Sequence, residues 1–175
     1  MVDELLQVVN ERGETIGSIG KLAAHRNGGT WHRAVSVFIF NPIGELLIQQ
    51  RSFEKYHFAG KWANSCCSHP WPGEATISAA TRTTERELGI VLQLRELGVF
   101  RYSASDPESG LAEKEHDHVF VGRWDAKVPF AESEVSAIRW ISLGQLQEEM
   151  SAFPEQFAPW LGLILGKFEE INQAA

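Results

Sequence analysis

Residues 34–51 read AVSVFIFNPIGELLIQQR, and this stretch is the clearest indication of a β-sheet in the chain. Two runs of β-branched and aromatic side chains flank an Asn-Pro-Ile-Gly sequence, a pattern typical of a β-hairpin. Residues 5–19, LLQVVNERGETIGSI, have the same organisation around Asn-Glu-Arg-Gly and predict a second hairpin. Further strands are expected at about 92–104, 115–124 and 135–141.

Helices are predicted between and after these strands. Residues 75–88, ATISAATRTTEREL, precede Gly89, which stands where many helices end in a left-handed glycine. Pro159 opens an amphipathic segment that we expect to be helical to residue 172. Shorter helices are expected at residues 20–25 and 143–150. The sequence therefore predicts an α+β fold, with a mixed β-sheet between helices.

Length and composition limit the kinds of protein that this chain can be. Its 175 residues predict a single domain over 1–175, and the net charge of −7, without a Lys/Arg stripe, argues against nucleic-acid binding. The longest apolar run is too short to span a bilayer, and no secretory signal is expected. Two adjacent cysteines are not a disulfide framework, so we expect a cytoplasmic protein with reduced thiols and no membrane partner.

Several residues have the side chains that metal ions prefer. His25 and His32 flank a glycine-rich loop, and His69 follows the two cysteines. Glu113 and Glu115 are two residues apart, so on an extended strand both carboxylates face the same side. Three imidazoles and two carboxylates suit Mn²⁺, Zn²⁺ or Mg²⁺ with a position left for substrate.

The alternative for these residues is that surface loops contain scattered histidines. His116 and His118 add two more imidazoles close to the carboxylates, but on the opposite side of the expected strand. We expect His57 to be an exposed loop residue.

Cys66 and Cys67 could be a redox pair, half of a metal site, a nucleophile or core residues. Most cysteines are small buried thiols, and we expect this of at least one of the pair. A functional thiol needs an accessible position near a positive charge, which a metal beside His69 would supply.

The helix expected at 75–88 carries a catalytic-box pattern, G-x5-E-x7-R-E-U-x-E-E-x-G-U, where U is aliphatic. The matching positions are Glu74, Arg82, Glu87, Gly89 and Ile90. The departures are Ser68, Thr83 and Arg86, in place of a glycine and two glutamates. The pattern resembles the Nudix box, whose carboxylates bind Mg²⁺ on a diphosphate. Because only Glu87 remains of the helical carboxylate cluster, the sequence favours holding a diphosphate over hydrolysing it.

The chain as a whole resembles type I isopentenyl-diphosphate isomerases over about residues 5–165. The resemblance rests on KLAAH (21–25), the H-x6-H pair, QQRSFEKYHFAGKWANSCCSHP (49–70), GE (73–74), ERELGI (85–90), RYSASDP (101–107) and EKE (113–115). Asn64 to Pro70 matches the family's N-x-x-C-x-H-P segment, with Cys67 at its cysteine. The resemblance implies a Nudix-like fold. It also implies an enzyme that interconverts isopentenyl diphosphate and dimethylallyl diphosphate in isoprenoid biosynthesis.

The resemblance also implies a role for each matching residue. The implied metal-binding residues are His25, His32, His69, Glu113 and Glu115, and Cys67 is expected as a further metal ligand. The implied catalytic residues are Cys67 and Glu115, with Tyr102 and Trp160 beside them. The implied substrate contacts are Lys21, Arg51, Lys55, Arg82 and Trp160, and Glu87 serves a Mg²⁺ ion on the diphosphate.

The reaction type explains why these residues would be needed. An alkene is a weak base, so a double-bond shift needs an acid on one face and a base on the other. We expect Glu115 to be the acid, Cys67 as thiolate to be the base, and Trp160 to stabilise a carbocation. The remaining hypotheses are a Nudix hydrolase of an organic diphosphate and a non-catalytic metal- or diphosphate-binding module. The expected partner is a small-molecule substrate, and the expected assembly is a monomer or weak dimer.

Overall fold

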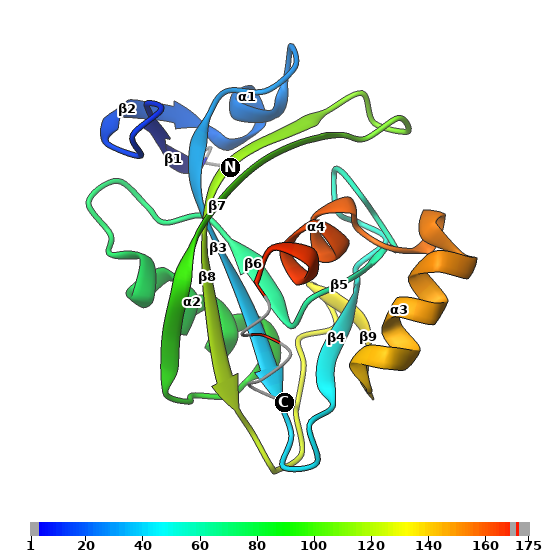
Figure 1. Cartoon of the computed structure of the whole chain (residues 1–175). Coiled ribbons are helices and arrows are strands. Elements are labelled where there is room, and N and C mark those ends of the chain that lie inside the picture. The colour runs from blue at the N-terminus through cyan, green and yellow to red at the C-terminus, as the bar shows by residue number, and fades with distance from the viewer. Residues whose placement is uncertain (1–3, 169–170, 172–175) are drawn as a thin grey trace.

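The computed structural model describes residues 4–168 and 171, and a hairpin lies at its centre (Figure 1). Strand β3, His32–Phe40, turns back into β4, Leu46–Arg51. Asn41 closes the turn, because its Oδ1 accepts hydrogen bonds from the amides of Ile43 at 3.2 Å and Glu45 at 2.9 Å. Gly44 has a φ of +83°, a conformation that glycine adopts without strain. The predicted hairpin is therefore confirmed.

Strand β3 also organises the rest of the sheet. It pairs antiparallel with β1, β4 and β6 and parallel with β8, while β7 pairs with β8, β9 and β5 with β4, and β2 with β1. The other strands are β1 Leu5–Val9, β2 Thr15–Gly20, β5 Trp62–Ala63, β6 Cys66–Ser68, β7 Leu94–Ser105, β8 Ala112–Arg123 and β9 Val135–Ile141. The parallel pairing of β3 with β8 joins the two halves of the chain.

Helices lie on both sides of the sheet (Figure 1). They are α1 Lys21–His25, α2 Thr76–Leu88, α3 Leu143–Ala152, the 3₁₀ helix Pro154–Gln156 and α4 Pro159–Lys167. Alternation along β3 separates two apolar cores: Val35 and Val37 belong to the core that includes α2, whereas Phe38 and Phe40 belong to the core that includes α4. The mixed sheet between helices confirms the predicted fold class.

The structure differs from the expectations at some boundaries and in two short strands. Helix α4 ends at Lys167, where Phe168 leaves helical geometry, and residues 169–170 and 172 of the expected helix lie outside the described residues. Strand β8 begins three residues early, so Glu113 lies within it. Strands β5 and β6 are too short to give a periodic pattern, and the sequence did not predict them. No helix within the described residues is long and apolar enough to cross a membrane.

Candidate active site

The parallel pairing of β3 with β8 brings the predicted ligands together. In this register His32 lies opposite Glu115, and on the other side of β8 Tyr102 lies opposite Glu115. Glu113 shares the face of Glu115 because side chains alternate along a strand. Helix α1 contributes His25 from its last turn. Residues far apart in the sequence therefore meet on one side of the sheet.

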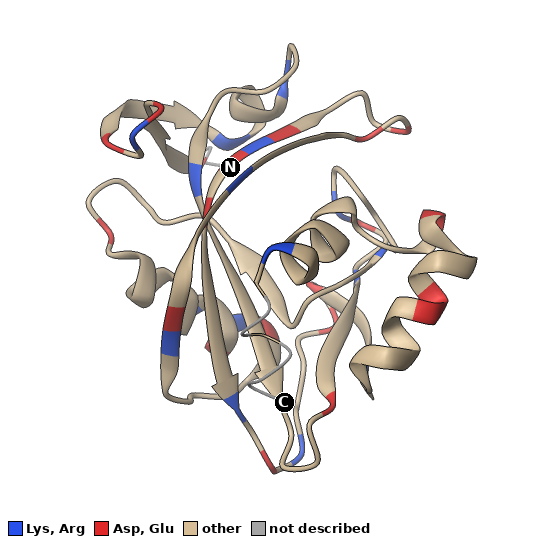
Figure 2. Cartoon of the chain, viewed as in Figure 1, with Lys and Arg blue, Asp and Glu red and all other residues tan. Residues whose placement is uncertain are grey.

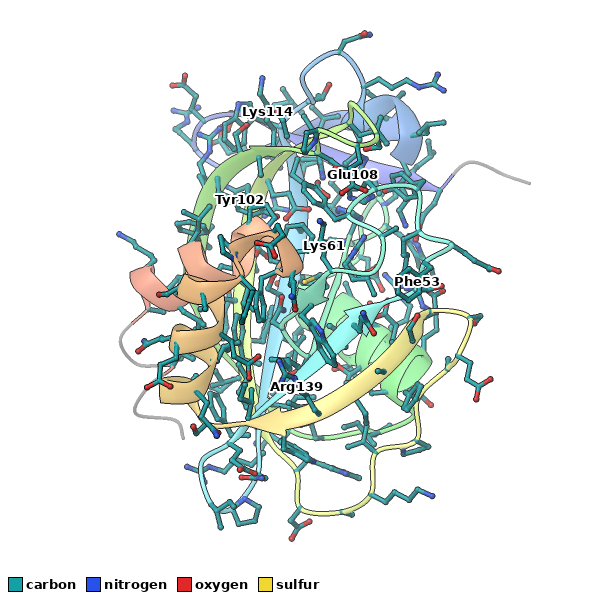
Figure 3. The ribbon with its side chains drawn as sticks, turned by 90° about the vertical axis from the view of Figure 1, so that its right-hand side faces the viewer. Phe53, Lys61, Tyr102, Glu108, Lys114 and Arg139 are labelled. Atoms are coloured by element: carbon teal, nitrogen blue, oxygen red, sulfur yellow. The ribbon has the colours of Figure 1, made fainter. Side chains whose placement is uncertain are left out.

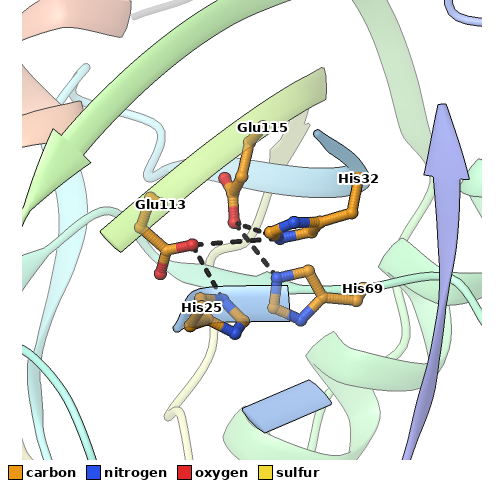
Figure 4. A group of neighbouring side chains, drawn as sticks. All are labelled: His25, His32, His69, Glu113 and Glu115. Carbon is orange, nitrogen blue, oxygen red and sulfur yellow. Dashed lines mark hydrogen bonds and ion pairs between the residues drawn. The ribbon is translucent and has the colours of Figure 1, made fainter. Parts of the chain in front are cut away.

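Five buried side chains form a compact cluster, which Figure 4 shows. One possible ligand atom from each of His25, His32, His69, Glu113 and Glu115 lies within 4.8 Å of all the others. The Oε2 atom of Glu113 is 2.9 Å from Nε2 of His25, and Oε1 of Glu115 is 3.1 Å from Nε2 of His69. Such a group of side chains could hold a metal ion.

The hydrogen bonds behind the cluster fix the imidazole rings. The Nδ1 atoms of His25 and His32 are 2.6 Å and 2.7 Å from the carbonyl oxygens of Lys21 and Thr30. Because a carbonyl only accepts, each Nδ1 carries the proton and each Nε2 presents a lone pair to the centre. Both Nε2 atoms and Oε2 of Glu113 are buried without a hydrogen-bond partner. Such unsatisfied atoms fit a divalent cation.

The protonation states also favour a cation. Burial opposes ionisation of Glu113, but its contacts with His25 and His57 hold its pKa well below the usual value. Burial and the charge of Glu113 raise the pKa of Glu115, but its contacts with His32 and His69 outweigh them and lower it. Burial lowers the pKa of His69 to about 4, with a contribution from His32. Metal ligands must be deprotonated, and Glu113, Glu115 and His69 meet that condition. For His25, burial lowers the pKa, but the contact with the Glu113 carboxylate outweighs it and raises the pKa, so a metal ion would have to displace a proton there.

Cys67 lies next to this cluster, held by a buried amide. Its Sγ donates to Oδ1 of Asn64 at 3.1 Å, and the indole Nε1 of Trp160 donates to the same oxygen at 3.1 Å. The Asn64 side-chain nitrogen donates to the carbonyl oxygens of Val37 at 3.1 Å and Cys66 at 3.0 Å, which fixes the orientation of the amide. One side chain therefore positions both the thiol and the indole.

A carboxyl group lies behind the thiol. The Ser36 hydroxyl is 3.5 Å from Sγ of Cys67 and donates to Oδ2 of Asp117 at 2.7 Å. Burial raises the pKa of Cys67 to about 12, and the charge of Asp117 contributes. The surrounding protein groups thus favour the thiol, whereas the predicted base is the thiolate. Asp117 is four residues from Glu113 on the same strand, and this spacing was the signal in the sequence that could have identified it.

Aromatic residues close the apolar end of the site. The Tyr102 hydroxyl donates to Oε2 of Glu115 at 2.5 Å. Trp160, only 2% exposed, packs edge-on against Phe58 at 5.2 Å between ring centroids. The guanidinium of Arg51 lies 5.4 Å from the Trp160 ring. The Trp160 ring therefore has the Arg51 cation near it and the apolar ring of Phe58 packed against it.

A cavity of about 50 Å³ connects the thiol, the cluster and a basic end. Lys21, Arg51, Lys55, Arg86 and Glu87 line it together with Cys67, Tyr102 and Trp160. Three of the cations have carboxylate partners: Lys21 with Glu4, Lys55 with Glu134, and Arg86 with Glu87. Elsewhere Lys and Arg are dispersed among acidic residues along the ribbon (Figure 2). The volume holds only a few water molecules, so side chains must move to admit a larger ligand.

Arg82, the fourth predicted substrate contact, has other partners. Its guanidinium makes two 2.8 Å contacts with the Glu74 carboxylate and lies 3.8 Å from the Trp71 ring centroid. It is not among the residues that line the cavity. Arg86, one helical turn later, lines the cavity instead, and it was not among the predicted substrate contacts.

His57 is buried, so the expectation that it is exposed is wrong. Only 5% of its surface is accessible, and its Nε2 contacts Oε1 of Glu113. The loop folds inward because Phe58 packs on Trp160 and its amide donates to Oδ2 of Asp106 at 2.9 Å. The sequence did contain an indication that this loop is partly buried, because three residues with rings follow one another from Tyr56 to Phe58.

His116 and His118 lie on the other side of β8. His118 contacts Arg33 at 2.8 Å through Nε2 and Glu96 at 2.6 Å through Nδ1. Neither histidine belongs to the converging cluster among the described residues.

Comparisons with known proteins identify relatives of this chain. The NUDIX domain model matches residues 30–161. The isopentenyl-diphosphate Delta-isomerase of Streptomyces coelicolor is 45% identical over 92% of this chain and 81% of its own length. The Halorhodospira halophila protein of the same name is 41% identical over 93% of each chain. The crystal structure of DR0079 from Deinococcus radiodurans has a TM-score of 0.76 at 26% identity and covers 92% of this chain and 97% of that chain.

Proposed function

The chain belongs to the isopentenyl-diphosphate Delta-isomerases, which are built on a NUDIX domain, and we propose that Cys67 and Glu115 carry out its reaction. That reaction interconverts isopentenyl diphosphate and dimethylallyl diphosphate. One observation supports the assignment above the others: a thiol, a carboxylate of the His/Glu cluster and an indole line the same buried cavity. A hydrolase would have no use for the thiol.

The two residues exchange protons with opposite ends of the allylic unit. Glu115, with the Tyr102 hydroxyl on its Oε2, delivers a proton to the terminal alkene carbon. Cys67, as thiolate, removes a proton from the carbon nearer the diphosphate. The double bond moves by one carbon, and the roles reverse in the opposite direction. Asn64 and Ser36 keep the thiol aimed at the cavity.

Positive charge that develops at the branched carbon requires stabilisation without water. The face of Trp160 provides this by cation–π attraction, worth on the order of 2 kcal/mol in a desolvated pocket. Phe58 packs on Trp160 in the first turn of α4, and this apolar packing would help to exclude water that could capture the intermediate.

The basic end of the cavity holds the diphosphate. Three of the predicted substrate contacts line this end with positive charges: Lys21, Arg51 and Lys55. Arg86 adds a second guanidinium. Glu87 is only 3% exposed, and its carboxylate would hold a Mg²⁺ ion bound to the diphosphate. Fixing this end positions the alkene between Glu115 and Cys67, so binding energy remote from the reacting carbons contributes to the rate.

The His/Glu cluster would hold one Mn²⁺, Zn²⁺ or Mg²⁺ ion through three imidazoles and two carboxylates. When bound, such an ion would supply a fixed positive charge that makes protonated Glu115 a stronger acid and favours the thiolate of Cys67. The enzyme would act on its small-molecule substrate in the cytoplasm, as a monomer or weak dimer.

An isotope experiment tests the reaction. Isopentenyl diphosphate incubated with the enzyme and Mg²⁺ in D₂O should give dimethylallyl diphosphate with deuterium in a methyl group, measured by NMR and mass spectrometry. The reason is that the acid exchanges with solvent before it protonates the alkene. Release of inorganic phosphate without the isomer would instead identify a Nudix hydrolase.

A further inference from the structure

A fourth imidazole reaches the cluster from the loop between β4 and β5. His57 contacts Oε1 of Glu113 through Nε2, on the opposite oxygen from the one that faces His25 and His32. His57 is not among the five residues whose ligand atoms converge. Its position therefore needs an explanation of its own.

The two oxygens of Glu113 have different surroundings. Oε2 lies 2.9 Å from Nε2 of His25 and 3.9 Å from Nε2 of His32, without a hydrogen-bond partner. Oε1 is occupied by His57. Because a carboxylate only accepts, Nε2 of His57 carries the proton of this bond. A carboxylate bonded on one oxygen cannot turn freely and presents its other oxygen in one direction.

We propose that His57 is a positioning residue, which holds Oε1 of Glu113 so that Oε2 points to the metal as a single ligand atom. The inference rests on the metal site of the proposed function. Hydrogen bonds to metal ligands commonly contribute 10- to 100-fold in metal affinity.

Packing and a backbone hydrogen bond restrict His57, although its Nδ1 has no hydrogen-bond partner. Tyr56 stacks on it with 4.2 Å between centroids, and Arg51 donates to its backbone oxygen at 3.1 Å. The loop is also tied at its end, where Lys61 lies 3.3 Å from Glu108 at the tip of the β7–β8 connection, both labelled in Figure 3. A rigid donor can impose an orientation on the carboxylate, which a mobile one could not.

Mn²⁺ alone serves as the probe in the test, with EDTA-treated protein and competition against a fluorescent chelator. His57→Phe keeps a ring beside Tyr56 but removes the donor, and we expect it to weaken Mn²⁺ binding by about 10- to 100-fold. His57→Gln places an amide N–H near the same oxygen and should restore most of the affinity. His116→Ala, on the other face of β8, is the matched control and should bind as the wild type does.

Pulsed electron paramagnetic resonance of the Mn²⁺ forms separates positioning from ligation. The number of imidazole nitrogens coupled to the ion should be equal in the wild type and in His57→Phe. One fewer nitrogen in the variant would make His57 a ligand and overturn the proposal, as would unchanged affinity. Equal melting temperatures of the metal-free proteins exclude misfolding, and His57→Gln carries the test if the Phe variant does not fold. A wild type that isomerises its substrate but binds no Mn²⁺ would reject this inference and leave the reaction in place.

Discussion

Strands β3 and β8 carry histidines and charged residues on both faces, yet the two groups differ in kind. The inner group is the His/Glu cluster of the cavity. The outer group consists of Arg33 on β3, His116 and His118 on β8, and Glu96 on the neighbouring strand β7. Neighbours in sequence belong to different groups, as His32 and Arg33 do, because side chains alternate across a sheet.

Charge explains the difference between the groups. The inner group has two buried carboxylates and imidazole nitrogens without partners. In the outer group Arg33 and Glu96 occupy both ring nitrogens of His118. Burial, with the charges of His118, Arg33 and Arg101, lowers the pKa of His116 to about 4. The outer group has only one carboxylate, Glu96, and no free ring nitrogen on His118, although it contains the same ligand types.

The largest expected effect on activity tests whether the two adjacent cysteines of β6, whose side chains point to opposite faces, have different roles. Cys67 faces the cavity, while Cys66 is fully buried in the core against α2. Cys67→Ala should lower kcat by about 10²- to 10⁴-fold because it removes a proton-transfer group. Cys67→Ser should stay impaired, since a hydroxyl is a far weaker acid than a thiol of pKa about 8.5.

Cys66→Ser is the matched control and should keep most of the activity, with a stability loss of about 1–3 kcal/mol from a buried hydroxyl. An epoxide analogue of the substrate should label Cys67, which peptide mapping identifies. Label on Cys66 alone, with Cys67→Ala active, would reverse the assignment.

The next effect compares the inner and outer groups directly. His25→Ala, His69→Ala and Glu113→Gln should lose bound metal and most activity, whereas His116→Ala and His118→Ala should keep both. Metal analysis by mass spectrometry and thermal melting with and without EDTA provide the measurements. The chelator should destabilise the wild type and the outer variants but have little effect on Glu113→Gln. Metal loss in His116→Ala with retention in Glu113→Gln would refute the comparison.

A smaller effect distinguishes two arginines of α2. Arg86 lines the cavity, whereas Arg82 is bound to Glu74 and Trp71. Arg86→Ala should raise KM roughly tenfold or more, because a hydrogen bond to a charged group contributes about 1.5–3 kcal/mol. Arg86→Lys, which keeps the charge, should lie in between. A larger KM increase in Arg82→Ala than in Arg86→Ala would restore Arg82 as the substrate contact that the sequence predicted.

The smallest effect concerns the outer group alone. His118→Ala removes the contacts with Glu96 and Arg33, which are partly exposed to solvent. Such pairs contribute about 0.2–1 kcal/mol to the free energy of unfolding. Urea unfolding should detect a loss in that range, with metal content and kcat unchanged. A loss of several kcal/mol, or of metal, would mean that the two faces are coupled.

The sequence determined the elements whose patterns are local. The hairpin at 34–51 follows from β-branched runs around an Asn-Pro-Ile-Gly turn, and α2 ends at Gly89, which has the left-handed φ of +67°. The two-residue spacing of Glu113 and Glu115 predicted that they share a face, and they do. Such features depend on backbone geometry within a few residues.

Only the tertiary structure decided which chemically similar residues meet. Whether His57 faced solvent or Glu113 depended on the packing of Phe58 against Trp160, a residue from α4. Whether Arg82 or Arg86 lined the cavity depended on how α2 lies on β6. These outcomes arise from pairing between distant segments, above all the parallel register that sets His32 opposite Glu115. No local pattern encodes that register, because it is selected by the burial of both strands' apolar faces at once.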